Sequence, residues 1–462
     1  MTLIKSISGI RGTIGGAVNT NLTPIDTVKF AAAYGTWIKE QRSKESYRVV
    51  IGRDARISGA MIQNLVMNTL IGMGIDVIDL DLSTTPTVEI AVPLEHADGG
   101  IILTASHNPK QWNALKLLDH NGEFLNSEHS QRVLDIAAAD SMEFAGVDDL
   151  GTITKNQAYF DIHIDAVLDL EHVNVKAIAA CKFKVVVDAV NSTGGIAIPL
   201  LLERLGVEAV KLHCEPNGHF PHNPEPLKQH LTDLSEKVVA SAADFGIAVD
   251  PDVDRLAFMD EKGVMFGEEY TLVACADYIL SHKPGNTVSN LSSTRALRDV
   301  TEKHGGTYTA SAVGEVNVVN AMKASNASIG GEGNGGIIYP ESHYGRDALV
   351  GVALFLSLLA ERKIAVSTLR ASYPSYFMSK KKIDLNPTID VDAILVAMET
   401  RYSQEQISTI DGVKIDFPTE WVHLRKSNTE PIIRIYTEAP TQGTADKLAD
   451  KIINEIKEVA GL

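Results

Sequence analysis

The fold class of this 462-residue chain is decided by one stretch, residues 47–78: YRVVIGRDARISGAMIQNLVMNTLIGMGIDVI. Its first residues, Tyr47–Ile51, are typical of a strand, and a turn rich in Gly, Asp and Ser follows. Ala60–Met73 then carries apolar residues at helical spacing, on a face that comprises Ile62, Leu65, Val66, Thr69, Leu70 and Met73. Gly74 ends the predicted helix, and Ile75–Ile78 is strand-like again. Strand, turn, helix, glycine and strand in this order indicate an α/β unit.

The same order occurs twice more. Lys184–Asp188 is followed by a Ser/Thr/Gly turn, a helical segment ending at Leu205, Gly206 and the strand-like Val207–Val210. A weaker copy begins with Thr287–Leu291 and continues through a helix to Thr307–Thr309. The repetition predicts three α/β domains of related topology, although such units are so common that repetition alone does not prove relatedness. Further helices are predicted at Pro226–Ala242, Glu268–His282, Glu315–Lys323 and Asp347–Arg362.

The C-terminal part of the chain follows a different pattern. Its predicted elements are strand Ser379–Leu385, helix Asp390–Tyr402, strands Val413–Phe417 and Ile432–Thr437, and helix Thr441–Val459. Too few crossovers separate these strands for a parallel sheet, so an α+β domain is predicted. The predicted domains are residues 1–150, 151–258 and 259–372, each α/β, and the α+β domain 373–462.

Composition and charge narrow the class of partner. The 59 acidic residues exceed the 42 basic ones, and the resulting net charge of -17 disfavours binding to nucleic acid or anionic membranes. No apolar run reaches the ~20 residues of a membrane span, and the N-terminus lacks the apolar core of a secretion signal. Three widely spaced cysteines fit buried thiols in a reducing compartment. A cytoplasmic protein is predicted.

Ser106 lies in Thr104–Pro109, directly after the apolar, strand-like Gly100–Leu103. Strand ends in α/β folds hold much of their chemistry, so this serine is a candidate functional residue. A turn serine beside Pro109 is the alternative, and these residues alone do not separate the two.

Lys116 is close to Ser106 in sequence and is flanked by apolar residues. If it were desolvated, its pKa would be depressed and it could move protons, whereas a lysine that reaches solvent is the alternative.

Asp250, Asp252 and Asp254 form the strongest single motif. They alternate between two apolar, strand-like runs. Carboxylates that converge on one point repel each other unless a cation sits between them, and hard oxygen ligands select Mg²⁺, Mn²⁺ or Ca²⁺. An EF-hand loop is disfavoured because Arg255 stands where the sharp turn needs glycine, and a solvated acidic loop remains an alternative. We predict a Mg²⁺ site with one position open for a ligand oxygen.

Two later loops carry polar groups suited to a ligand. Residues 330–336, GGEGNGG, match a dinucleotide fingerprint in form, but an extended segment broken by Pro340 follows instead of a helix. Glu332 and Asn334 suit hydrogen bonding to sugar hydroxyls, with a hairpin turn as the alternative. The second loop combines cations, hydroxyls and an amide. These groups suit a phosphate-binding site, and a turn with a helix cap is the alternative. Its polar residues are Arg425, Lys426, Ser427, Asn428, Thr429 and Glu430, with Arg434 beyond.

Arginine also stands between glycines twice near the N-terminus. Gly9–Gly12 contains Arg11, and Gly52–Gly59 contains Arg53 and Arg56. Backbone at glycine can approach a ligand closely, but surface turns are equally compatible with these stretches.

Together these motifs resemble those of the α-D-phosphohexomutase superfamily, which includes phosphoglucomutase, phosphomannomutase and phosphoglucosamine mutase. The resemblance covers essentially the whole chain and rests on five motifs in the family order: Gly9–Gly12, Thr104–Pro109, Asp250–Arg255, Gly331–Gly336 and Arg425–Pro431. It implies an α/β protein with three related α/β domains plus a C-terminal α+β domain around a central active-site cleft. It also implies an isomerase that moves a phosphoryl group within a phosphosugar.

The resemblance further implies roles for particular residues. Ser106 would carry a phosphoryl group that passes to a hexose monophosphate, and the bisphosphate formed would return its other phosphate to the serine. A sugar bisphosphate would therefore activate the enzyme. One Mg²⁺ ion would be held by Asp250, Asp252, Asp254 and a phosphoryl oxygen on Ser106. Lys116 would transfer protons, with His107 and Arg255 near the reacting phosphate. The implied substrate-binding residues are Arg11, Glu332, Asn334, Arg425, Ser427, Asn428, Thr429 and Arg434.

Three departures from the family pattern bear on the substrate. The sugar loop ends in Gly333–Gly336 where many members have a Ser-Gly-His type of ending, Asn428 replaces a glycine, and Pro251 replaces another. This sugar loop is most similar to that of phosphoglucosamine-type members, which favours conversion of glucosamine 6-phosphate to glucosamine 1-phosphate. A phosphomannomutase or phosphoglucomutase is the alternative, ahead of a Mg²⁺-dependent sugar phosphatase or a non-catalytic sensor. A monomer or homodimer is expected.

Overall fold

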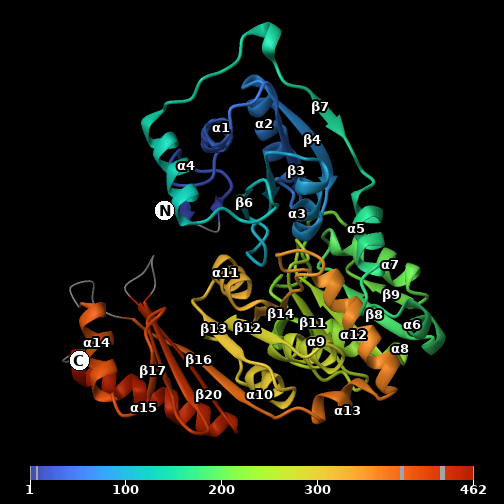
Figure 1. The fold of residues 1–462 in the computed structure, drawn as a ribbon, viewed down its shortest axis with the longest axis vertical. Helices are drawn as coiled ribbons and strands as arrows, with labels where there is room; N and C mark the ends of the chain where they lie inside the picture. The colour runs from blue at the N-terminus through green and yellow to red at the C-terminus, as the bar shows by residue number, and fades with distance from the viewer. Residues whose placement is uncertain (1, 7–8, 385–389, 427–431, 461–462) are drawn as a thin grey trace. The chain divides into compact units, whose positions relative to one another are not determined.

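The computed structural model describes residues 2–6, 9–384, 390–426 and 432–460 (Figure 1). The chain packs as two compact units. The first comprises Met1–Ile279 and Asn334–Thr368, and the second comprises Leu280–Gly333 and Leu369–Leu462. Over the described ranges, no helix is both long and apolar enough to cross a membrane.

A mixed sheet in the first unit is built by the N-terminal part of the chain, coloured blue to blue-green in Figure 1. In spatial order its strands are β1 (Ile4–Ser6), β2 (Gly9–Thr13), β6 (Trp112–Leu118), β5 (Gly99–Leu103), β3 (Tyr47–Arg53), β4 (Ile75–Leu82) and β7 (Ile153–Lys155). β3 pairs in parallel with β4 and β5, whereas β6 is antiparallel to β5 and β2. The carboxyl ends of β3 and β5 therefore lie at the same edge of the sheet.

Helices cover both faces of this sheet. They are α1 (Pro24–Gln41), α2 (Gly59–Gly72), α3 (Thr85–Leu94) and α4 (Ser127–Ala139), with a short 3-10 turn, η1, at Val147–Asp149. Because side chains alternate along a strand, Val49 and Ile51 join the core formed with α1, α2 and α4, while Val50 joins the core formed with α3. α1 begins after Thr23, whose hydroxyl and the Asp26 carboxylate form a capping box.

A second sheet in the first unit has the order β11 (Leu256–Met259), β10 (Phe245–Val249), β8 (Lys184–Asp188) and β9 (Glu208–Leu212). β8 is parallel to β9 and β10, and the turn between β10 and its antiparallel partner β11 carries the aspartate motif. The helices of this region are α5 (Tyr159–Leu168), α6 (Val175–Cys181), α7 (Gly194–Arg204), the 3-10 turn η2 (Lys228–His230) and α8 (Thr232–Ser241).

The long helix α12 (Ala348–Arg362) packs against β11, the strand that follows the aspartate turn. The N–H of its first residue, Ala348, donates to the Val253 carbonyl in that turn. The helix is apolar almost all round, and its residues are buried on every face through Ala360. Phe355 stacks on Phe258 of β11, with ring centroids 3.8 Å apart, and contacts Phe245 and Phe266. β15 (Gly336–Ile338) precedes α12, and α9 (Glu268–His282) and α13 (Val366–Ala371) complete the helices near the ends of this unit.

The second unit contains a parallel sheet and an antiparallel sheet. β12 (Asn286–Asn290) pairs in parallel with β13 (Tyr308–Ser311) and β14 (Ala327–Glu332), and the accompanying helices are α10 (Ala296–Lys303) and α11 (Glu315–Ser325). The antiparallel sheet has the order β16 (Phe377–Asp384), β20 (Ile432–Ala439), β19 (Trp421–Lys426), β18 (Val413–Asp416) and β17 (Gln406–Ser408). α14 (Val391–Arg401) and α15 (Gln442–Ala460) share its apolar core.

The predicted fold class is confirmed. Each of the three repeated units forms a parallel strand pair joined by a helix: β3 and β4, β8 and β9, β12 and β13. The C-terminal sheet is antiparallel with helices, as expected of an α+β domain. One helix was predicted too long, because residues before Thr232 form only the short turn η2 instead of continuing α8 back to Pro226. The domain boundaries predicted from the sequence stay predictions.

Candidate active site

Ser106 lies in a tight turn just after β5. Its φ of 46° is in the left-handed region, and the residue is only 8% exposed. Its backbone N–H donates to the hydroxyl of Thr104 at 2.9 Å, and that hydroxyl donates to Asp54 Oδ2 at 2.7 Å. Asp54 follows β3, so the two neighbouring parallel strands β3 and β5 together shape the turn that presents the serine.

Arg56 holds the other side of this turn. Its side chain is fully buried and pairs with Asp54 Oδ2 at 2.9 Å. Its guanidinium donates to the backbone carbonyls of Ser106, Asn108 (2.7 Å), Pro109 (2.7 Å) and Trp112 (3.1 Å). The sequence left Arg56 open between a ligand contact and a surface turn, but the structure shows a buried brace for the Ser106 loop.

The three aspartates lie together in the turn between β10 and β11, and none is exposed to solvent. Ser106 Oγ donates to Asp250 Oδ2 at 2.8 Å. The other Asp250 oxygen accepts from the backbone N–H of Asp254 (3.2 Å) and of Arg255 (3.1 Å). Val253, between Asp252 and Asp254, has a φ of 63°, in the left-handed region. The solvated-loop alternative for this motif is therefore wrong.

The aspartate cluster fits a divalent cation. One oxygen of each carboxylate lies within 4.8 Å of the others, and the Oδ1 atoms of Asp252 and Asp254 are buried without a hydrogen-bond partner among the described residues. Burial and the nearby charges of Asp252 and Asp254 raise the pKa of Asp250 well above its ordinary value. A cation between them would relieve this repulsion and satisfy the orphaned oxygens.

Cationic side chains surround the cluster. Lys116 Nζ lies 2.7 Å from Asp252 Oδ2 and 3.4 Å from Asp254 Oδ2, and Arg346 Nη2 donates to Asp254 Oδ2 at 2.6 Å. Burial alone would lower the pKa of Lys116, but the charges of Asp252 and Asp254 raise it above its ordinary value. The depressed lysine pKa considered from the sequence is therefore wrong for this arrangement.

His107, Arg255 and Arg11 are the remaining predicted residues near Ser106 and the aspartates. His107 Nδ1 lies 3.4 Å from Ser106 Oγ, and burial together with the charges of Arg255 and Arg11 lowers its pKa to about 2. Arg255 Nε lies 3.9 Å from Asp250 Oδ2, and its Nη1 lies 3.3 Å from Glu225 Oε1. Arg11 is on β2, which pairs with β6, the strand that carries Lys116. The structure thus brings Ser106, His107, Lys116, Arg255 and the aspartates together.

The remaining predicted residues lie elsewhere in the chain. In the second unit, Glu332 ends β14, and its Oε1 accepts from Asn290 Nδ2 (2.9 Å) and from the Gly314 N–H (3.3 Å). Arg425 and Arg434 face each other in register on β19 and β20, and Arg425 Nε lies 2.9 Å from Asp411 Oδ2. Asn334 belongs to the first unit, where its Oδ1 accepts from the Gly336 N–H at 3.1 Å. Ser427, Asn428 and Thr429 lie outside the described residues.

Four family models match consecutive parts of the chain. They describe the phosphoglucomutase/phosphomannomutase α/β/α domains I, II and III and the C-terminal domain, and they match residues 3–143, 161–263, 267–376 and 379–455. The chain belongs to the phosphoglucomutase/phosphomannomutase family. It therefore has the four-domain architecture of that family, whose members are isomerases of the mutase class.

Curated relatives of this family member span nearly its full length. A phosphoglucomutase/phosphomannomutase from Thermococcus kodakarensis is 35% identical, with 97% of this chain and 98% of the relative covered. A phosphoglucosamine/phosphogalactosamine mutase from Sulfurisphaera tokodaii is 32% identical, with 96% and 97% covered. A crystal structure of a phosphoglucomutase/phosphomannomutase family protein from Burkholderia thailandensis has the same fold, with a TM-score of 0.85 over 99% of this chain and 98% of that one, at 24% identity.

Several residues of this mutase-family site were missed from the sequence. Arg346 and Thr85 both contact the aspartates, since the Thr85 hydroxyl donates to Asp252 Oδ2 at 2.7 Å. Neither stands in a motif: Thr85 lies in a Thr/Pro stretch where α3 begins, and Arg346 follows a single glycine. Asn290, which holds Glu332, ends a strand that was predicted, so a polar residue at a strand end was the available signal.

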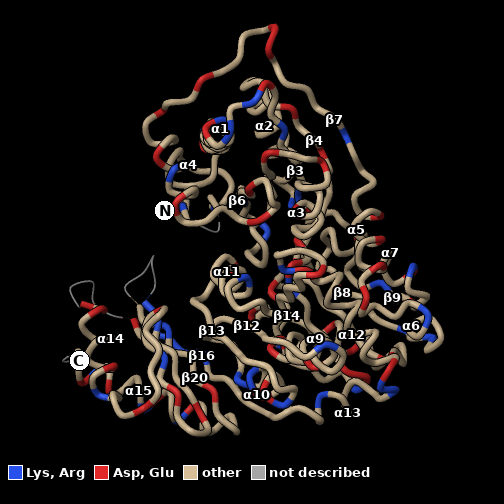
Figure 2. Tube along the Cα trace, in the orientation of Figure 1, with Lys and Arg blue, Asp and Glu red and all other residues tan. Residues whose placement is uncertain are grey.

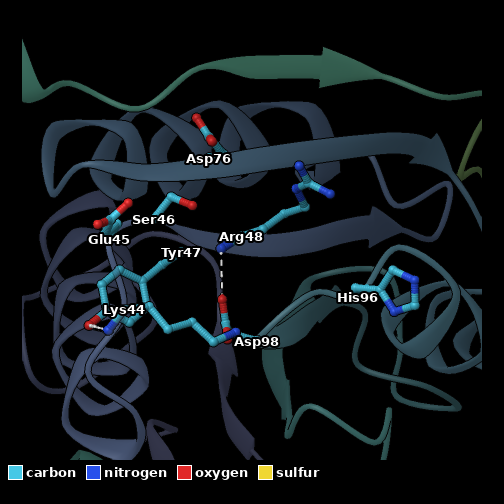
Figure 3. Close-up of a pocket in the computed structure, with 8 residues that line it drawn as sticks. All are labelled: Lys44, Glu45, Ser46, Tyr47, Arg48, Asp76, His96 and Asp98. Carbon is cyan, nitrogen blue, oxygen red and sulfur yellow. Dashed lines mark hydrogen bonds and ion pairs between the residues drawn. The ribbon is translucent and has the colours of Figure 1, made fainter.

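A hollow of about 420 Å³ in the first unit is a different feature (Figure 3). Its lining includes Tyr47, Arg48, Asp76 and Asp98, which stand at the amino ends of β3, β4 and β5. Ser106 follows the carboxyl end of β5, where α/β folds place their ligands. Lys44 and Asp98 form an ion pair within this hollow, and we assign it no part in catalysis.

Proposed function

We propose that this chain interconverts the 6-phosphate and 1-phosphate of a hexose or hexosamine, through a phosphoserine at Ser106 and a bisphosphorylated sugar. The observation that carries the proposal is the 2.8 Å contact between Ser106 Oγ and Asp250 Oδ2, at the edge of a buried carboxylate cluster with orphaned oxygens. A serine in this position is suited to hold a phosphoryl group beside a divalent cation.

Mg²⁺ is the ion we assign to Asp250, Asp252 and Asp254, because a cluster made of hard carboxylate oxygens favours it. When bound, Mg²⁺ would neutralise negative charge on the phosphoryl oxygens. Lys116 and Arg346 already compensate part of the charge of Asp252 and Asp254. Arg255, close to Asp250, is the side chain that we assign to the outer oxygens of the phosphoryl group.

Ser106 acts as the carrier in two half-reactions. In the first, the bond between phosphorus and Ser106 Oγ breaks as a bond forms from phosphorus to a hydroxyl oxygen of the sugar monophosphate. That hydroxyl gives up a proton, and the released serine oxygen takes one up. Lys116, which its carboxylate neighbours keep protonated, is assigned to this proton transfer from the sugar hydroxyl to the serine oxygen, and His107, with Nδ1 3.4 Å from Ser106 Oγ, lies beside the reacting phosphate. The second half-reaction repeats these steps in reverse with the other phosphate of the bisphosphate.

Residues outside this centre are proposed to bind the rest of the substrate. Arg425 and Arg434 lie directly opposite on paired strands, an arrangement suited to a phosphate, and we extend this phosphate site to Ser427, Asn428 and Thr429. Glu332 and Asn334 are proposed to contact sugar hydroxyls, and Arg11 to bind a phosphate. A sugar bisphosphate is the proposed activator, since it would transfer a phosphoryl group to unphosphorylated Ser106.

Glucosamine 6-phosphate and glucosamine 1-phosphate are the proposed substrate pair. The sugar loop Gly333–Gly336 supports this choice, and a relative at 32% identity is named a phosphoglucosamine/phosphogalactosamine mutase. Mannose and glucose phosphates are the alternative, supported by the name of the relative from Thermococcus kodakarensis. Action in the cytoplasm, as a monomer or homodimer, stays a prediction from the sequence.

Coupled assays of the purified chain on the 1-phosphates of glucosamine, mannose and glucose test the proposal. A preference in kcat/KM above ~100-fold for the glucosamine sugar, or about 2.8 kcal/mol in transition-state stabilisation, would support the proposed substrate. A ratio near one would mean a mutase of broad specificity. Steady release of inorganic phosphate at the rate of turnover would contradict the mutase and indicate a phosphatase.

A further inference from the structure

Asp188, His213 and His222 meet at the carboxyl edge of the second sheet, in a group that the proposed reaction does not use. Asp188 ends β8 and pairs in register with Leu212, the last residue of β9, so His213 is the first residue after that neighbouring strand. The loop after β9 returns to the same edge and places His222 Nε2 3.0 Å from Asp188 Oδ2. One donor atom from each of the three residues lies within 4.8 Å of the others.

Both imidazole rings are oriented by an acceptor on their other side. His222 Nδ1 lies 2.8 Å from the carbonyl oxygen of Asn223, and His213 Nε2 lies 3.1 Å from Asp233 Oδ2. When His222 Nδ1 donates to that carbonyl, Nε2 of the neutral ring turns a lone pair toward the Asp188 carboxylate. This contact requires either a second proton on the ring, which Asp188 favours by raising the pKa of His222 against the effect of burial, or a cation bound to both atoms. Metal-binding histidines are typically held by a carbonyl or carboxylate in this way.

The surroundings define the ligand set. The side chain of Asp188 is 1% exposed, whereas those of His213 and His222 are 20% and 16% exposed, so an ion has access from solvent. Cys214 is adjacent in sequence but is turned away, because its Sγ lies 3.3 Å from the carbonyls of both Val187 and Leu212. Burial raises the pKa of this thiol to about 11. The available protein ligands are therefore two imidazoles and one carboxylate.

We propose that Asp188, His213 and His222 bind a divalent transition-metal ion of the Zn²⁺ class, with water completing the coordination. Two imidazoles with one carboxylate favour Zn²⁺, Co²⁺ or Ni²⁺, whereas the carboxylate cluster at Asp250 favours Mg²⁺. The two sites thus differ in ligand chemistry and select different ions.

By binding His213 and His222 together with Asp188, the ion would hold the loop between β9 and η2 against the end of β8. This loop contacts the brace residue Arg56 and the candidate phosphate-binding residue Arg255. The Phe220 ring lies 5.1 Å from the Arg56 guanidinium, and Glu225 Oε1 lies 3.3 Å from Arg255 Nη1. Because His222 lies between Phe220 and Glu225 in the sequence, binding at this site stabilises the loop that carries both contacts. The proposed role is structural.

Isothermal titration with Zn²⁺ tests the proposal, on full-length metal-stripped protein in excess Mg²⁺ so that the carboxylate cluster is saturated. The wild-type chain is expected to bind one equivalent of Zn²⁺ and to melt at a higher temperature with it. His213→Gln and His222→Gln are each expected to weaken this binding by at least about 10-fold, and Asp233→Asn by about 10- to 100-fold, as for other residues that orient a metal-bound histidine. His219→Gln changes an exposed histidine of the same loop and is expected to bind Zn²⁺ like the wild type.

Two results would overturn the proposal: no Zn²⁺ equivalent in the wild type, or unchanged Zn²⁺ binding in His213→Gln and His222→Gln. Circular dichroism of each metal-free variant checks its folding. If one histidine variant is unfolded, the other and Asp233→Asn decide the outcome. None of these substitutions changes Ser106 or the carboxylate cluster of Asp250, Asp252 and Asp254. Mutase activity in Mg²⁺ alone therefore tests the proposed function separately from the Zn²⁺ site.

Discussion

Two residues of the candidate active site adopt a backbone conformation that L-amino acids rarely take. Ser106 has a φ of 46°, and Val253, between Asp252 and Asp254, has a φ of 63°. The left-handed region costs a non-glycine residue about 1–2 kcal/mol, and it is especially unusual for a β-branched side chain. Hydrogen bonds on both sides hold these turns, from the Ser106 N–H to Thr104 and from the Ala348 N–H to the Val253 carbonyl. We infer that the strain is retained because it directs Ser106 toward the aspartates.

Arg56→Lys tests whether the buried brace positions the serine. A lysine keeps the charge beside Asp54 but cannot donate to the carbonyls of residues 106, 108, 109 and 112 together. We expect kcat to fall by about 100-fold with little change in KM, because the nucleophile is displaced while the distant substrate contacts remain. Steady-state kinetics measure both constants.

Arg53→Lys is the matched control for this experiment. Arg53 ends β3, three residues before Arg56, and its guanidinium contacts Gln63, Asp81 and the Asp54 carbonyl instead of the Ser106 loop. We expect kcat to stay within about 3-fold of the wild type. Equal losses in the two variants would show that the turn as a whole matters and that Arg56 has no specific positioning role.

Asp252→Asn tests the assignment of the carboxylate cluster. The substitution removes one charge while keeping the side-chain volume, so the Mg²⁺ concentration for half-maximal activity should rise by at least about 10-fold. Asp260→Asn is the control, because Asp260 is a buried carboxylate that caps the turn after β11 and should leave the Mg²⁺ dependence unchanged. An Asp252 variant with wild-type Mg²⁺ dependence would place the ion elsewhere.

At the scale of elements, the sequence predicted the strands and helices of the three repeated units, but it did not predict the helices α1, α3, α4 and α5. β19 was missed although it is central in its sheet, because its polar residues His423, Arg425 and Lys426 break the apolar pattern. The structure shows why His423 is tolerated there. It is 1% exposed, with Nδ1 2.9 Å from Ser292 Oγ and Nε2 2.7 Å from the Asp411 carbonyl. Such tertiary hydrogen bonds are not visible in a single-sequence pattern.

The buried His423 makes stability depend on pH. Burial lowers the pKa of His423 to about 4, below the ordinary value of 6.5, so the unfolded chain binds a proton at pH 5 that the folded chain does not. Stability is therefore full above about pH 6.5 and is lost as the pH falls toward 4. Between pH 7.5 and 5 we expect this residue to remove about 2 kcal/mol from the free energy of unfolding.

Urea denaturation followed by tryptophan fluorescence measures this effect, since Trp421 lies on the same strand. His423→Gln cannot titrate, so its loss of stability between the two pH values should be smaller than that of the wild type by this amount. The same pH dependence in both proteins would refute the assignment to His423. His304→Gln, which changes a histidine at the end of α10, serves as the control.

Across the molecule as a whole, the aspartate and serine motifs were recognisable from their residues, but the residues alone did not predict their contact. Ser106 and Asp250 are 144 residues apart, and Asp254 and Arg346 are 92 apart, so each contact depends on how separate α/β layers pack. The family resemblance supplied the first pairing. The contact between Asp254 and Arg346 had no sequence signal, because Arg346 belongs to no motif and lies just before a helix.

The net charge of -17 is also a property of the whole chain. Figure 2 shows Lys and Arg interspersed with Asp and Glu along both units. A phosphorylated substrate therefore depends on local cations. In the first unit Lys116, Arg255 and Arg346 lie within ion-pair distance of the buried aspartates, and the charge of Arg255 acts on Arg11. This local arrangement supports a phosphate-handling site in an acidic protein.

Mass spectrometry shows whether Ser106 carries the phosphoryl group. The purified chain and its Ser106→Ala variant are incubated with glucose 1,6-bisphosphate and Mg²⁺, and the intact masses and the peptide containing residue 106 are measured. We predict that the wild type gains the mass of one phosphoryl group on Ser106, that the variant gains none, and that mutase activity is lost in the variant. A variant that keeps full mutase activity, or a wild type phosphorylated at another residue, would contradict the account.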